Sequence, residues 1–169
     1  MRHSFAALVS LLAASAAMAG TELTIEIPQL GVAEYHRPYV AAWIEKPDRS
    51  VAANLSVWYD IAMKDGEGAT WLKDIRQWWR KSGRSLKMPV DGVSGPTRPV
   101  GTHTVTIPGK AAALPPLAEG EYNLVVEASR EVGGREMLRV PFKWDGKTAV
   151  DISAQGKSEL GKVRLAIQP

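Results

Sequence analysis

The chain has 169 residues, no cysteine and a formal net charge of +3, from 21 basic and 18 acidic side chains. The lack of cysteine excludes a disulfide framework, and the mixing of both charge signs along the sequence argues against nucleic-acid or membrane-surface binding. Beyond the first residues, no apolar run approaches the length of a membrane span, so we expect no membrane insertion.

Residues 1–19 have the pattern of a secretory signal peptide. Arg2 supplies the positive charge, residues 5–17 form a short apolar run, and Ala17-Met18-Ala19 is a small-x-small cleavage site. Cleavage after residue 19 of 169 leaves 150 residues, the size of one ordinary domain. We therefore predict export to the periplasm and a single β-sandwich domain over residues 20–169.

Most of the remaining chain shows the period-two alternation of β-strands, interrupted by turn residues. Gly133-Gly134 predicts a hairpin, Pro141 indicates an edge strand, and Leu55, Val57 and Tyr59 are expected on one face. The predicted strands are residues 22–27, 37–45, 51–59, 102–107, 121–128, 136–143, 150–152 and 162–167. This pattern predicts an all-β fold, an immunoglobulin-like β-sandwich of about seven to nine strands.

Between residues 70 and 83 the apolar period changes to that of a helix. Thr70 is a plausible N-cap, and Gly83 stands where such a helix would end. Trp71, Trp78 and Trp79 are expected to form its buried stripe. We predict one amphipathic helix inserted into the sandwich and packed on a sheet.

A polar loop rich in glycine and proline, residues 91–99, follows this helix and is the part of the sequence most suggestive of function. Gly92 and Gly95 would leave room for a large partner, and Pro96 stiffens the backbone before the Thr97 hydroxyl. The alternative is a plain turn, in which Asp91 and Ser94 bond to their own backbone and Thr97 starts a strand.

The spacing Asp91-x-x-Ser94-Gly95-x-Thr97 resembles the acceptor motif of proteins that receive FMN from an extracytoplasmic flavin transferase, with Pro96 where the motif has alanine. In such a transfer the threonine hydroxyl attacks the pyrophosphate of FAD, AMP leaves, and FMN remains as a phosphoester. The resemblance implies covalent FMN on Thr97, and Arg98 would then be placed to pair with its phosphate.

Three segments, residues 37–45, 91–99 and 120–131, are similar to the predicted periplasmic family called the domain of unknown function 2271 (DUF2271). The resemblance implies association with flavin transferases and with membrane proteins that carry PepSY domains, in extracytoplasmic electron transfer or iron acquisition. It implies a covalent FMN carrier. The alternative is a cofactor-free periplasmic module that docks on a membrane PepSY-type partner.

The remaining candidates for chemistry are weaker. Trp78 and Trp79 would suit a flavin ring by stacking, although packing of the helix on a sheet explains them as well. His36 and His103 are far apart in sequence, and with no cysteine we expect no metal site. Ser94, His103 and Asp91 lack the context of a hydrolase triad. We therefore expect a carrier or binding module and not an enzyme.

Overall fold

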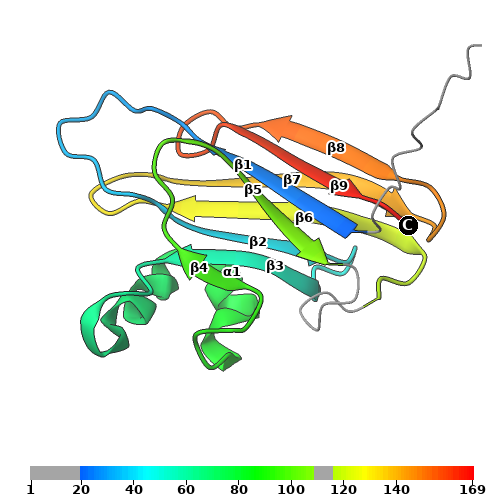
Figure 1. Cartoon of the computed structure of the whole chain (residues 1–169), viewed down its shortest axis with the longest axis horizontal. Helices are drawn as coiled ribbons and strands as arrows, with labels where there is room; N and C mark the ends of the chain where they lie inside the picture. Colours follow the sequence, from blue (N-terminus) through cyan, green and yellow to red (C-terminus); the bar gives the residue numbers. More distant parts are fainter. Residues whose placement is uncertain (1–19, 109–115) are drawn as a thin grey trace, which may run out of the picture.

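The computed structural model describes residues 20–108 and 116–169, so the predicted signal peptide lies outside the described residues. Within them the chain forms nine strands and three short helical segments (Figure 1). The strands are β1 (Gly20–Ile27), β2 (Tyr39–Glu45), β3 (Val51–Tyr59), β4 (Ser94–Pro96), β5 (Gly101–Pro108), β6 (Gly120–Ser129), β7 (Arg135–Trp144), β8 (Val150–Gln155) and β9 (Lys162–Ile167). The helical segments are the 3-10 helix η1 (Lys64–Asp74), the α-helix α1 (Arg76–Lys81) and the 3-10 turn η2 (Gly83–Ser85).

The strands form two sheets, ordered β5-β1-β9-β8 and β4-β3-β2-β6-β7. All neighbouring strands are antiparallel except β3 and β4, which are parallel. The predicted mainly β fold of two sheets is confirmed, as is the predicted hairpin, β6–β7. Strand β7 is an edge strand, as Pro141 indicated, because an edge position tolerates the missing N–H.

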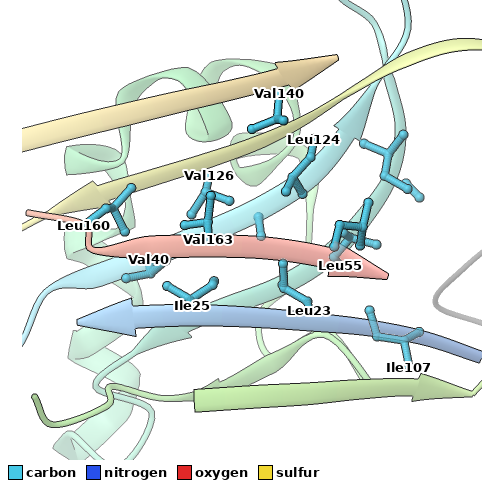
Figure 2. Close-up of a cluster of buried hydrophobic side chains, with 14 of the residues drawn as sticks. Leu23, Ile25, Val40, Leu55, Ile107, Leu124, Val126, Val140, Leu160 and Val163 are labelled. Carbon is cyan, nitrogen blue, oxygen red and sulfur yellow. The ribbon is translucent and has the colours of Figure 1, made fainter. Parts of the chain in front are cut away.

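The main core lies between the two sheets and comes from the alternation of apolar and polar residues. On β1, Leu23 and Ile25 are fully buried and belong to the same core cluster as Leu124 and Val126 of β6 in the other sheet (Figure 2). Each such side chain contributes about 1.5–3 kcal/mol when fully buried. Burial of this shared cluster holds the two sheets together.

A β-bulge in β3 changes which residues share a face. Ala42 pairs with Ser56 and Trp43 pairs with Asn54, so Leu55 has no partner on β2. The extra residue reverses the alternation, and Leu55 joins the core between the sheets while Val57 and Tyr59 join a second core on the other face. The expectation that all three share a face is therefore wrong.

The second core lies under the helical segments, which cover the outer face of the five-stranded sheet (Figure 1). Leu72, Ile75 and Trp78 are fully buried here, against Trp43 and Val57. None of the helices in the described residues is long and apolar enough to span a membrane.

The prediction of one continuous, regular helix over residues 70–83 is wrong. The chain is a 3-10 helix up to Asp74, breaks at Ile75 (ψ 75°), and becomes α-helical only from Arg76. Thr70 lies inside η1 and caps nothing, and Trp71 is 47% exposed instead of buried. The cause is a tertiary contact, because the buried Glu127 carboxylate accepts the N–H groups of Gln77 (3.0 Å) and Trp78 (3.0 Å) and sets the start of α1.

Candidate functional site

A cleft of about 1200 Å³ opens at one end of the five-stranded sheet, where several of its strands begin or end. Its lining comes from Tyr39 at the start of β2, Asp60 after β3, Thr97 after β4, Ser129 at the end of β6 and Arg135 at the start of β7. Segment η1 and the β6–β7 hairpin contribute further residues. The full lining is His36, Arg37, Tyr39, Asp60, Met63, Glu67, Trp71, Asp74, Arg76, Thr97, Ser129, Arg130, Glu131, Val132, Gly133, Gly134 and Arg135.

Tyr39 fixes the position of η1 beside the sheet. Its ring meets the ring of Tyr59 edge-on at 6.3 Å, and its hydroxyl donates to the Gly68 carbonyl at 3.1 Å. Burial raises the pKa of the Tyr39 hydroxyl above its usual value of 10, further from neutral pH. Gly68 lies so close to the Asp60 backbone that a side chain at this position would collide with the Asp60 carbonyl oxygen.

Exposed apolar side chains surround this cleft. Trp71 is 47% exposed, Met63 36% and Val132 75%. Val132 has a φ of 50° at the tip of the β6–β7 hairpin, a conformation that costs a β-branched residue energy. Large apolar side chains exposed together around a cleft are typical of binding sites.

The charges in the cleft are of both signs. The Arg130 Nε lies 2.8 Å from Glu159, and the Arg135 Nε lies 3.8 Å from the buried Glu127. By contrast, no acidic group of the described residues lies within 4.0 Å of Arg37 or Arg76. These two guanidinium groups are available to an anionic ligand.

Thr97 follows the edge strand β4 and lies in the wall of the cleft. Its backbone N–H donates to the Tyr59 carbonyl at 3.1 Å, and the residue is half-buried. The sequence suggested a hydroxyl presented on an open loop. The structure instead holds Thr97 next to a strand, because residues 94–96 pair with β3.

The other residues of the predicted motif lie outside the cleft lining. The Ser94 hydroxyl accepts the Val90 N–H at 2.8 Å, which is the role expected of a plain turn. Asp91 is exposed, and a side chain added at Gly95 would make only an ordinary contact with Trp58 at 3.7 Å. The Arg98 guanidinium lies over the Trp58 ring, 5.5 Å from its centroid. Thr97 therefore lines the cleft, whereas Arg98, the next residue, does not.

The two tryptophans proposed as a flavin wall do not line the cleft. Trp78 is fully buried and donates from its indole nitrogen to Asn54 at 2.9 Å, and Trp79 packs half-buried against the same core. Core packing therefore accounts for both. The exposed aromatic ring is that of Trp71, which the helical period placed in the core.

Sequence reasoning also missed Arg37, Tyr39, Arg76 and Val132. One signal was present for Arg37, Tyr39 and Val132, since predicted strands begin or end near these three residues and neighbouring strand ends meet at one end of a sheet. The sequence does not show which strand ends lie together, because that depends on the order of the strands in the sheet.

A family model described as predicted periplasmic protein (DUF2271) matches residues 20–162 of the chain. The family description agrees with the export expected from residues 1–19. No curated protein and no solved structure gives a significant match. The three segments that carry the resemblance all reach the cleft, through Arg37, Thr97 and the pair Arg130 and Glu131.

Proposed function

The chain belongs to this family of predicted periplasmic proteins, and from that premise we propose that it carries FMN as a phosphoester on Thr97. In this proposal the protein is a redox accessory in an extracytoplasmic electron-transfer or iron-acquisition system and catalyses no reaction of its own. The observation that supports it most is the position of Thr97 in the wall of a cleft that also contains an exposed tryptophan and two unpaired arginines.

Attachment requires a flavin transferase and FAD. A bond forms between the Thr97 oxygen and the FMN phosphorus, the pyrophosphate bond breaks, AMP leaves, and the hydroxyl proton passes to a base of the transferase. The chain itself only has to hold the hydroxyl in place, and the bond from the Thr97 N–H to Tyr59 does so. Pro96 fits this arrangement because β4 is an edge strand and needs no N–H there.

The cleft residues suit the attached group. A volume of about 1200 Å³ exceeds that of an ordinary small-molecule pocket and leaves room for FMN. The exposed Trp71 ring can stack on a flavin ring, and Arg37 and Arg76 can pair with a phosphate. Bound FMN would supply reversible electron transfer, while these side chains would bind and orient it.

The test is intact-mass analysis of the periplasmic protein co-expressed with a flavin transferase. We expect the wild-type mass to increase by one FMN and the Thr97→Ala mass to remain unmodified. Thr102→Ala is the matched control, because Thr102 is exposed on β5 and does not line the cleft, and it should be modified like wild type. Unmodified mass in all three proteins would refute the proposal.

The second candidate is a cofactor-free module that docks on a membrane PepSY-type partner. The exposed Trp71, Met63 and Val132 around the cleft favour it, because such side chains are frequent in protein interfaces. This function predicts a colourless protein that is recovered crosslinked to a membrane protein. Visible absorbance of the purified protein separates the two candidates.

We also propose an immunoglobulin-like relationship for the two sheets. The strands of an immunoglobulin domain are named A to G. In the proposed scheme β1 and β5 correspond to strands B and E of one sheet, and β2, β6 and β7 correspond to strands C, F and G of the other. Strand β9 pairs antiparallel with β1 and would take the place of strand A. Superposition of the two sheets on immunoglobulin domains, strand by strand, tests this assignment.

A further inference from the structure

The helical layer on the five-stranded sheet has a charge very different from that of the rest of the chain. Residues 68–90 contain six basic side chains and one acidic side chain, Asp74, which gives this segment a net charge of +5. The start of η1 adds Lys64, Asp65 and Glu67, so the layer and the segment after it, residues 64–90, have a net charge of +4. The whole chain has a net charge of only +3, so the remaining residues together are acidic. The mixing of charges seen along the full sequence therefore does not hold on this layer.

Four of these basic side chains are exposed on the layer and form what we call the basic face: Arg76, Arg80, Arg84 and Lys87. No acidic group of the described residues lies within 4.0 Å of any of the four. The other two cations of the segment have local partners. Lys81 pairs with the buried Glu45 at 3.1 Å, and the Lys73 ammonium lies 5.2 Å from the centroid of the Trp71 ring.

Local stability does not explain this arrangement. Arg76 and Arg80 are four residues apart on α1, where like charges repel each other. Arg76 also lies in the first turn, where the helix dipole disfavours a cation and where α1 has no acidic residue. Arg80 lies in the last turn, where the dipole favours a cation, but the place of Arg76 and its spacing from Arg80 are unfavourable, so we look for a role of these cations in binding.

We propose that the basic face docks an acidic surface of a partner protein. Three of its four cations are arginines, whose guanidinium groups pair with carboxylates through two hydrogen bonds and are enriched in protein interfaces. A membrane surface is less suited, because the apolar side of this layer, Leu72, Ile75 and Trp78, is already buried on the sheet.

This docking does not depend on a flavin. Arg76 belongs both to the basic face and to the cleft lining, so a docked partner would lie beside the cleft. Thr97→Ala should leave docking unchanged, which separates a failure of this inference from a failure of the proposed function.

The experiment uses the full-length protein in living cells, with a photo-crosslinking amino acid in place of Ser85. Ser85 is exposed on the helical layer, next to Arg84 of the basic face. The control position is Ser153, which is exposed on β8 of the other sheet. We expect a discrete adduct with another protein from position 85 and none from position 153. Mass spectrometry should place the crosslink in a segment rich in aspartate and glutamate.

Charge reversal then tests the role of the arginines. Arg80→Glu with Arg84→Glu should reduce the adduct on the order of tenfold, because attraction becomes repulsion. Lys147→Glu with Lys162→Glu changes the net charge equally, at exposed positions away from the layer, and should leave the adduct unchanged. If the glutamate variant unfolds, the milder pair Arg80→Gln and Arg84→Gln gives the same comparison.

Four outcomes would overturn the inference. They are the absence of a discrete adduct from position 85, an adduct that survives charge reversal, an adduct with a second copy of this chain, and a crosslinked segment without acidic residues. Sedimentation with vesicles of equal parts phosphatidylcholine and phosphatidylglycerol provides a further test. Binding to them that charge reversal abolishes would assign the basic face to lipid instead.

Discussion

Replacing Glu127 by alanine should destabilise the protein by about 3 kcal/mol, because this carboxylate determines where α1 begins. Glu127 is fully buried on β6. It accepts the N–H of Gln77 at 3.0 Å and that of Trp78 at 3.0 Å, and Arg135 lies 3.8 Å away. No other side chain of the described residues accepts either N–H.

The magnitude comes from the two backbone donors that the substitution leaves without a partner. A buried donor without a partner costs about 1–3 kcal/mol, and loss of a helix N-cap costs about 0.5–2 kcal/mol. These contributions overlap, so about 3 kcal/mol is expected in total, or a melting temperature lower by about 6–12 °C for a chain of this size. Glu127→Gln keeps an acceptor and should cost roughly half as much.

Urea unfolding monitored by tryptophan fluorescence measures this free energy, since Trp78 is buried directly beside the contact. Glu121→Ala is the matched control, because Glu121 lies on the same strand and is exposed, and it should change stability by less than about 0.5 kcal/mol. If Glu127→Ala is as stable as this control, the carboxylate does not hold α1 and the explanation of the helix break is wrong.

Three further predictions concern other parts of the chain. Burial opposes the charged form of Glu136, but backbone N–H groups of the β8–β9 loop donate to its carboxylate and lower its pKa below the usual 4.5. Its stabilising effect should therefore be present above pH 4.5 and be lost as the pH falls, so the stability difference between wild type and Glu136→Gln should shrink in acid unfolding curves. Val132→Asn should raise the midpoint of urea unfolding, by about 1 kcal/mol in stability, because asparagine accepts a φ of 50° more readily; a lower midpoint would show that the turn is not strained. Gly68→Ala should destabilise by roughly 2 kcal/mol through collision with the Asp60 backbone, whereas Gly31→Ala, with open space around it, should have almost no effect in the same assay.

The strands were predictable because their signal is local. Alternation of apolar and polar residues along a strand depends only on its own sequence, and the range 51–59 matches β3 at both ends. The face assignment within β3 failed, because a bulge opposite Ala42 and Trp43 reverses the alternation and no residue type marks it.

The candidate site was predictable only in part. Thr97 was singled out by a resemblance, and the structure places it in a cleft, yet the companions expected from the same motif, Ser94 and Arg98, lie elsewhere. A motif states which residues are close in sequence. It does not state which side of an extended chain each one faces.

The sequence by itself determined the mainly β fold and eight of the nine strands, because these follow from local periodicity and turn residues. The remaining strand, β4, lies in the segment expected to be a loop and is a strand through its pairing with β3. The tertiary structure decided which strand ends lie together, and so placed Arg37, Thr97 and Arg135 around one cleft. It also decided that Trp71 is exposed and Trp78 buried, because Glu127, 49 residues beyond Trp78 in the chain, interrupts the helix between them. A carboxylate that distant in sequence leaves no local pattern in the segment whose structure it sets.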